Sequence, residues 1–209
     1  MTKNKAWALV MLGLIIILPF ISWYVMKEGE ELRRSNTASE LYNVSSIRIP
    51  DYNLISQRAD TISNQNMQNK VCVYEFYSED CYAGRYEGRH KLFELQEDYY
   101  GKTTAFRIIS VNLSDTSVQN RDLWQYSILY AAREIWHVTG GDTSVSKNIF
   151  EACEKYLTER NRIEQNLNCP SYVFIADRKG YLCGAYNIKD EKEYSSLFTD
   201  ILYTIDRKE

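Results

Sequence analysis

The feature that most constrains this chain is an uncharged apolar segment, AWALVMLGLIIILPFISWYVM, between Ala6 and Met26. A helix rises about 1.5 Å per residue, so this segment would span roughly 30 Å, the thickness of a bilayer's hydrocarbon core. Trp7 and Trp23 lie near its two ends, where interfacial aromatic residues are enriched. The alternative is a cleaved secretory signal, but the segment is long for one and has no small-x-small cleavage site before Lys27. The sequence therefore predicts one uncleaved transmembrane helix.

Charges beside this segment predict its orientation. Lys3 and Lys5 precede it without an acidic residue, whereas the basic residues that follow it are interleaved with glutamates. The positive-inside rule then places residues 1–5 in the cytoplasm. The apolar segment would cross the inner (cytoplasmic) membrane once. Residues 27–45 form a polar tether, and 46–209 a domain in the periplasm or another extracytoplasmic space.

The composition of the chain excludes several classes of protein. With 25 Lys and Arg against 28 Asp and Glu, the net charge is −3 and there is no basic block, so nucleic acid is not an expected partner. Hydrophobic residues at 44% and aromatic residues at 13% exclude a disordered chain. Five cysteines are an odd number and too few for a disulfide scaffold. These thiols therefore need another explanation.

Hydrophobic periodicity in the exported part predicts alternating strands and helices. The run VCVYEFY is nearly continuous, as expected for a buried central strand. Strands are predicted over 71–77, 104–113, 172–177 and 181–186, and helices over 82–99, 122–135, 144–157 and 190–205. This order predicts an α/β domain in which helices flank a central mixed sheet, with one parallel crossover and a closing antiparallel hairpin. It is similar to the order of thioredoxin-like proteins.

Five stretches in the same order resemble those of one known family. They are IPDYNLISQ (49–57), NKVCVYEFYSEDC (69–81), VNLSDT (111–116), IWHVTGG (135–141) and PSYVFIADRKGYLCGAYN (170–187). The set resembles the Sco/SenC family, which comprises membrane-anchored thioredoxin-fold proteins associated with copper delivery to cytochrome c oxidase. The resemblance implies the same fold, copper as a candidate cofactor, and a respiratory oxidase or another envelope complex as protein partner.

The copper ligands of this family are only partly present. The family uses a Cys-x-x-x-Cys motif after the central strand and a histidine before the hairpin. Cys81 matches the first cysteine, Arg85 stands where the second belongs, and Cys169 stands where the histidine belongs. The resemblance therefore implies a degenerate metal and redox site.

Cys81 and Cys169 are nevertheless candidates for a rebuilt two-thiol site. Cys81 lies where a strand is expected to end and a helix to begin, and helix-start amides together with Arg85 would favour its thiolate. By the resemblance, Cys169 faces Cys81, and the two thiols could form a disulfide or hold Cu(I). The alternative is that Cys81 and Cys169 are unrelated thiols, and that Arg85 pairs with Glu79 or Asp80.

The remaining cysteines and both histidines are expected to have structural roles. Cys72, Cys153 and Cys183 fall at positions typical of small core residues, although Cys183 could also lie at a sheet edge. His90 lies in a charged stretch of a predicted helix and is expected in solvent. His137 is expected in a turn before two glycines.

Three functions follow from these observations. No G-x-S-x-G, H-E-x-x-H, P-loop or dinucleotide motif is present, so enzymatic turnover is not expected. The first function is a non-catalytic binding or accessory module in envelope copper or redox homeostasis. The second is a Cu(I)-handling oxidase assembly factor, and the third a thiol–disulfide oxidoreductase using Cys81 and Cys169. Tyrosines around Cys81 could add an aromatic surface for a partner, or else be shell residues; they are Tyr74, Tyr77, Tyr82 and Tyr86.

Overall fold

The structure, a computed structural model, divides into two compact units, residues 1–42 and 43–209. It describes residues 7, 15, 17–29, 45–78, 85–114, 120–163 and 171–207, with the backbone alone for 85–89, 120 and 121. In the first unit, residues 17–29 are helical with exposed side chains. No helix among the described residues is long and apolar enough to cross a membrane. Much of the 6–26 segment lies outside the described residues, so its transmembrane helix stays a prediction.

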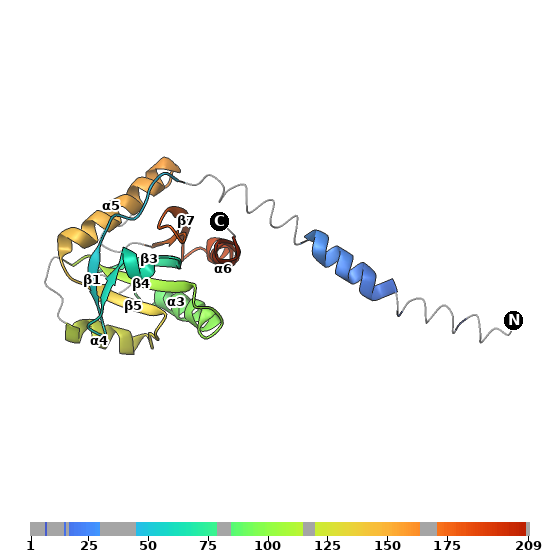
Figure 1. The fold of residues 1–209 in the computed structure, drawn as a ribbon, viewed down its shortest axis with the longest axis horizontal. Helices are drawn as coiled ribbons and strands as arrows, with labels where there is room; N and C mark the ends of the chain where they lie inside the picture. The colour runs from blue at the N-terminus through green and yellow to red at the C-terminus, as the bar shows by residue number, and fades with distance from the viewer. Residues whose placement is uncertain are drawn as a thin grey trace. The chain divides into compact units, whose positions relative to one another are not determined.

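The described part of the second unit is a single sheet of seven strands with helices on its faces (Figure 1). The strand order is β2-β1-β5-β4-β3-β6-β7. The pairs β3–β4 and β4–β5 are parallel, and the outer pairs are antiparallel. Along the chain the elements are β1 (Asn53–Ser56), β2 (Thr61–Ser63), α2 (Asn64–Met67), β3 (Val71–Tyr77), α3 (Arg85–Tyr99), β4 (Phe106–Asn112), α4 (Asn120–Leu129), β5 (Trp136–Gly140), α5 (Thr143–Glu159), β6 (Tyr172–Ala176), β7 (Leu182–Asn187) and α6 (Glu191–Asp206).

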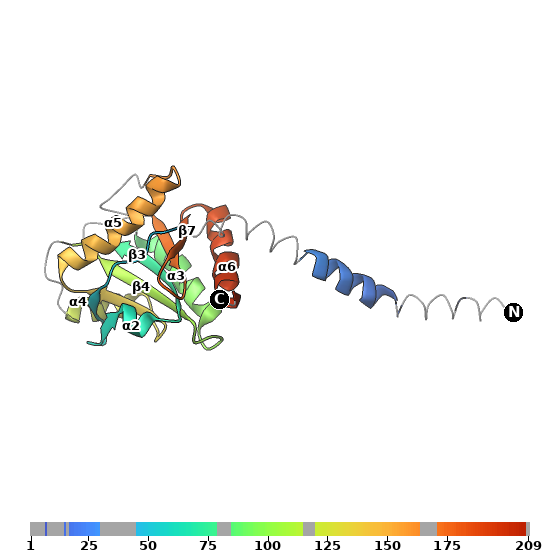
Figure 2. The same ribbon diagram turned by 45° about the horizontal axis from the view of Figure 1, so that its top comes forward.

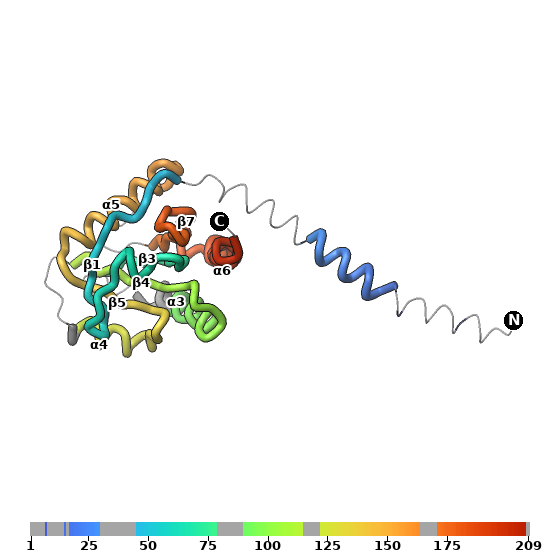
Figure 3. Tube along the Cα trace, viewed as in Figure 1, coloured from blue at the N-terminus to red at the C-terminus, as the bar shows by residue number. Residues whose placement is uncertain are grey.

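The core has two layers, one on each face of the sheet. Alternate residues of β3 point to opposite faces, so Tyr74 and Phe76 pack with α5, whereas Val73 and Tyr77 pack with α3, α4 and α6. The chain trace shows α5 across the sheet from α3 and α4 (Figure 3), and the turned view shows α6 beside β7 (Figure 2). Because both faces are covered, all seven residues of β3 are buried, as its continuous apolar run predicts.

Most of the predicted elements are confirmed, with one correction at the centre of the sheet. The predicted helix 122–135 ends at Leu129, and β5 follows it, which adds a second parallel pair where only one was expected. The helix cannot continue here, because Ala131 has a φ of +49°, outside the helical region. The Gln96 side chain stabilises this turn, because its amide donates to the Ala131 carbonyl and its carbonyl accepts from the Arg133 amide.

The last helix, α6, begins with an aspartate cap. The Asp190 carboxylate accepts hydrogen bonds from the backbone amides of Lys192 and Glu193, as an N-cap residue does. The Glu193 side chain does not complete a reciprocal box but accepts from the Asn187 amide and from Arg162. The cap therefore also joins α6 to the end of β7.

Candidate functional site at the carboxyl edge of the sheet

The described segments that lead toward the two predicted thiols adjoin one edge of the sheet. β3 runs parallel to β4 and antiparallel to β6, so the end of β3 and the start of β6 lie on the same edge. The chain leaves β3 through Ser78, three residues before Cys81, and enters β6 through Ser171, two residues after Cys169. Both cysteines lie outside the described residues, so their pairing stays a prediction. Arg85 begins α3, and only its backbone is described.

A buried carboxylate lies on β3 next to this edge, and the sequence reasoning missed it. Glu75 is only 7% exposed and accepts a hydrogen bond from the Ser110 hydroxyl of β4, directly opposite. Ser110 in turn accepts from the indole N–H of Trp136 on β5 at 2.8 Å. Buried charge is costly unless it is hydrogen-bonded, so this chain of contacts holds the three parallel strands in one register. The signal that could have found it is the one charged residue within VCVYEFY.

Of the tyrosines near this edge, the two that are described lie in the core, which favours the shell alternative over an aromatic surface for a partner. Tyr77 is 5% exposed, stacks on Tyr126 with ring centroids 4.4 Å apart, and donates to the Thr139 carbonyl. Tyr74 is 3% exposed, and its hydroxyl lies 3.0 Å from that of Tyr52. Tyr82 lies outside the described residues, as does the side chain of Tyr86.

The other three cysteines are buried and unpaired, which confirms their expected place in the core. Burial raises the pKa of Cys72 and of Cys183 to about 12, and that of Cys153 well above its usual range. A thiol is a poor nucleophile and metal ligand until it loses its proton. These three groups therefore remain protonated and unreactive in the folded domain.

The two histidines differ in their exposure to solvent. His90 is exposed on α3, as expected, and approaches Glu94 at 3.4 Å. The prediction for His137 is wrong, because this residue lies within β5 rather than in a turn and is 8% exposed. The described residues contain no group of three His, Cys, Asp or Glu side chains that could hold a metal ion.

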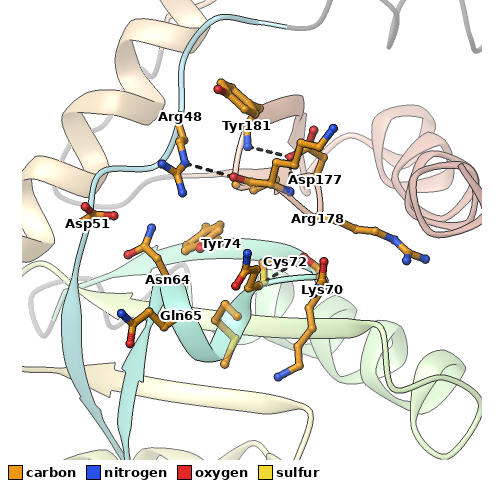
Figure 4. Close-up of a pocket in the computed structure, with 16 residues that line it drawn as sticks. Arg48, Asp51, Asn64, Gln65, Lys70, Cys72, Tyr74, Asp177, Arg178 and Tyr181 are labelled. Atoms are coloured by element: carbon orange, nitrogen blue, oxygen red, sulfur yellow. Dashed lines mark hydrogen bonds between the residues drawn. The ribbon is translucent and has the colours of Figure 1, made fainter. Parts of the chain in front are cut away.

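A pocket of about 560 Å³ lies at the opposite end of β3 (Figure 4). Arg48 borders it and donates from Nε to the Lys179 carbonyl, while the turn of the β6–β7 hairpin is closed by a bond from the Tyr181 amide to Asp177. Cys72 and Tyr74 lie at its floor, but their buried groups are protonated. This pocket therefore lies at the other end of β3 from Ser78, and the Cys72 thiol that lines it stays protonated.

Comparison with known proteins establishes the fold. No family model and no curated protein matches the sequence. Among solved structures, BsSco, a Sco-family cytochrome c oxidase assembly protein with an identified disulfide switch, has a TM-score of 0.59 at 14% identity, over 77% of this chain and 95% of its own. Yeast Sco1 with copper bound has a TM-score of 0.54 at 12% identity, over 76% of this chain and 94% of its own.

A putative protein disulfide isomerase from Bacteroides thetaiotaomicron is also similar, with a TM-score of 0.55 at 12% identity, over 77% of this chain and 89% of its own. Residues 46–207 therefore have the thioredoxin-like fold of the Sco/SenC proteins, and the resemblance seen in the sequence is confirmed at this level.

The sequence resemblance implies that the family's three-ligand copper set is incomplete in this chain. Arg85 is the first residue of α3, and by that resemblance it stands where the second cysteine belongs. A guanidinium is always protonated in proteins and cannot replace a thiolate ligand. That only two thiols, Cys81 and Cys169, occupy the ligand positions stays a prediction.

Proposed function

We propose that this chain is a membrane-tethered accessory protein of the cell envelope that acts in copper or redox homeostasis by binding a partner rather than by turnover. The observation that supports the proposal is the Sco-type fold, in which Arg85 is the first residue of α3. By the sequence resemblance, this arginine stands in place of the second copper-binding cysteine. The fold supplies a rigid platform, whereas the chemistry of the family's site is reduced. Binding is the function that such a platform retains.

We also propose in which compartment the domain lies. The segment 6–26 would anchor the chain in the inner membrane as a single helix with its N-terminus in the cytoplasm. The domain would then lie in the periplasm or another extracytoplasmic space, and its partner would be a respiratory oxidase or another envelope complex. Cytochrome oxidase assembly and copper are associated with the Sco proteins that share this fold, which supports this context.

A second candidate function is a two-thiol reaction of Cys81 with Cys169. It is favoured by the strand order, because β3 and β6 are neighbours and the two cysteine-bearing segments leave from the same edge. As an oxidoreductase, the dithiol would reduce a partner's disulfide, passing on two electrons and two protons and becoming a disulfide itself. As a Cu(I) carrier, the two soft thiolates would hold the ion directly.

A double variant separates these functions. In cells that lack the chain, we would express the wild type, Cys81→Ala/Cys169→Ala, or the core control Cys153→Ala, and measure cytochrome c oxidase activity and envelope copper. The accessory function predicts that the deletion lowers one of these and that the double variant restores it. If the double variant behaves like the deletion while the control restores function, the thiols are essential and the second candidate holds. A deletion without effect would overturn the proposed context.

A further inference from the structure

A row of basic groups crosses the amino end of the parallel strands, far along β3 from the Cys81 edge. In sheet order the groups are Arg58 after β1, His137 on β5, Arg107 on β4 and Lys70 before β3. The register brings them together: Cys72 pairs with Arg107, Ile109 pairs with His137, and Ser56 pairs with Thr139. Like charges on neighbouring strands destabilise a sheet, so this row needs a reason.

The three cations of the row have no carboxylate partner among the described residues. Lys70 donates from Nζ to the Asn66 carbonyl at 2.6 Å, and Arg107 donates to the Thr104 and Phe106 carbonyls. Burial lowers the pKa of Lys70, and Arg107 lowers it further. Burial also lowers the pKa of Arg107 itself. Burial therefore destabilises the charged form of Lys70 and of Arg107, and no anion that the structure describes offsets this cost.

One acidic residue acts on the outer end of the row. The Glu134 carboxylate is fully exposed, and a hydrogen bond with Tyr100 is the main cause that lowers its pKa, to which Arg58 and Arg133 add. In the described part of the chain, it does not come within salt-bridge distance of Lys70 or Arg107. The inner positions of the row are the uncompensated ones.

His137 provides an independent observation at the centre of the row. It is 8% exposed, and neither of its ring nitrogens has a hydrogen-bond partner. Burial is the main cause that lowers its pKa to about 4, and Arg107, Arg58 and Lys70 lower it further. A neutral imidazole carries one N–H donor, so His137 presents a buried donor among three cations.

We propose that Lys70, Arg107 and the imidazole N–H of His137 bind a phosphate group, with Arg58 at the open side of the site. Free phosphate carries more than one negative charge at neutral pH and a phosphodiester carries one, and both present at least two strong acceptor oxygens to these donors. A guanidinium binds such an oxyanion through two parallel N–H groups, and a lysine adds a point charge. The group would come from free phosphate or from a phospholipid head group.

The site lies beside the pocket of Figure 4, which Lys70 and Cys72 also line. Figure 4 shows the Lys70 side chain running away from Arg48. The inference does not depend on the proposed function, because it uses none of Cys81, Arg85 and Cys169.

Titration calorimetry of the full chain in an uncharged detergent tests this site, with inorganic phosphate and with glycerophosphoglycerol as a soluble head-group probe. We expect saturable binding of at least one probe at matched ionic strength. Binding of inorganic phosphate alone would identify free phosphate as the ligand, and equal binding of the diester would identify a lipid head group. If neither probe binds, the proposal is wrong.

Matched variants locate the binding. Arg107→Gln and Lys70→Gln should each raise the Kd for the bound probe about tenfold or more, and His137→Gln, which keeps an N–H donor, should raise it less. Lys189→Gln removes one charge from an exposed position outside the row and should leave the Kd unchanged. Thermal unfolding of each variant checks that it is folded. If Arg107→Gln and Lys189→Gln change the Kd equally, the binding is general charge attraction and the site is disproved.

Discussion

Two sets of polar groups on the parallel strands of this domain differ in their hydrogen-bond partners. Glu75 and Ser110 lie toward the carboxyl ends of β3 and β4, and with the indole of Trp136, whose backbone starts β5, they form a continuous hydrogen-bonded chain. At the amino end, Lys70 and Arg107 find only backbone carbonyls, and His137 finds no partner. A partnered network stabilises the fold by itself, whereas an unpartnered one costs stability until a ligand binds. The comparison thus separates a structural network from a binding site.

The largest effect is expected from breaking the partnered network. Ser110→Ala removes a partner from the Glu75 carboxylate and leaves the Trp136 indole N–H buried without an acceptor. Unpartnered buried polar groups cost about 1–3 kcal/mol each, so we expect a loss of about 3 kcal/mol in the free energy of unfolding by urea.

Thr139→Val is the matched control for this change. The Thr139 hydroxyl donates only to the Ser110 carbonyl, so its loss should cost about 1 kcal/mol. If Ser110→Ala costs no more than this control, the network does not hold the strands.

A change of intermediate size in the free energy of unfolding is expected on acidification. His137 has a pKa of about 4 in the folded state against about 6.5 when unfolded, so the unfolded state binds more protons between these values. Stability should therefore fall as the pH falls from about 6.5 toward 4. The loss attributable to His137 should reach about 2 kcal/mol at pH 5.

Urea unfolding at pH 7 and pH 5, in the wild type and in His137→Gln, measures this effect. The variant lacks a titrating group at this position and should lose about 2 kcal/mol less than the wild type on acidification. An equal loss in the two proteins would show that His137 is not held neutral by its surroundings.

The smallest effect is a gain in stability at the amino end. Arg107→Gln removes one of three neighbouring cations, so in buffer without phosphate it should raise the free energy of unfolding by about 0.5 kcal/mol. The exposed control Lys189→Gln should change it by less. A clear loss of stability in Arg107→Gln would show that the row is already compensated within the folded chain.

The sequence predicts the elements with strong periodicity and misses those that depend on tertiary contacts. VCVYEFY and the hairpin around Gly180 have unmistakable strand patterns, and Asp190 marks the start of α6. β5 is only five residues long and follows a helix-compatible stretch, and the helix ends because Gln96 stabilises a turn at Ala131. That contact joins residues 35 positions apart, so no local pattern reveals it.

The sites also differ in how far the sequence alone reveals them. Glu75 could have been found as the one charge in a buried strand. The basic row could not, because Arg58, Lys70, Arg107 and His137 become neighbours only through the strand order β1-β5-β4-β3. The predicted pair Cys81 and Cys169 rests on resemblance, and the strand order supports it only as far as the shared edge of the sheet.

The proposed function assumes that the family's copper site is degenerate in this chain, and an anaerobic Cu(I) titration of the full chain tests this. The reduced protein would compete with a chromophoric Cu(I) chelator, with Cys81→Ser and the core variant Cys153→Ala as comparison. We expect the wild type, Cys81→Ser and Cys153→Ala all to fail to take Cu(I) from the chelator. One equivalent of Cu(I) held tightly by the wild type and by Cys153→Ala, but lost in Cys81→Ser, would contradict it.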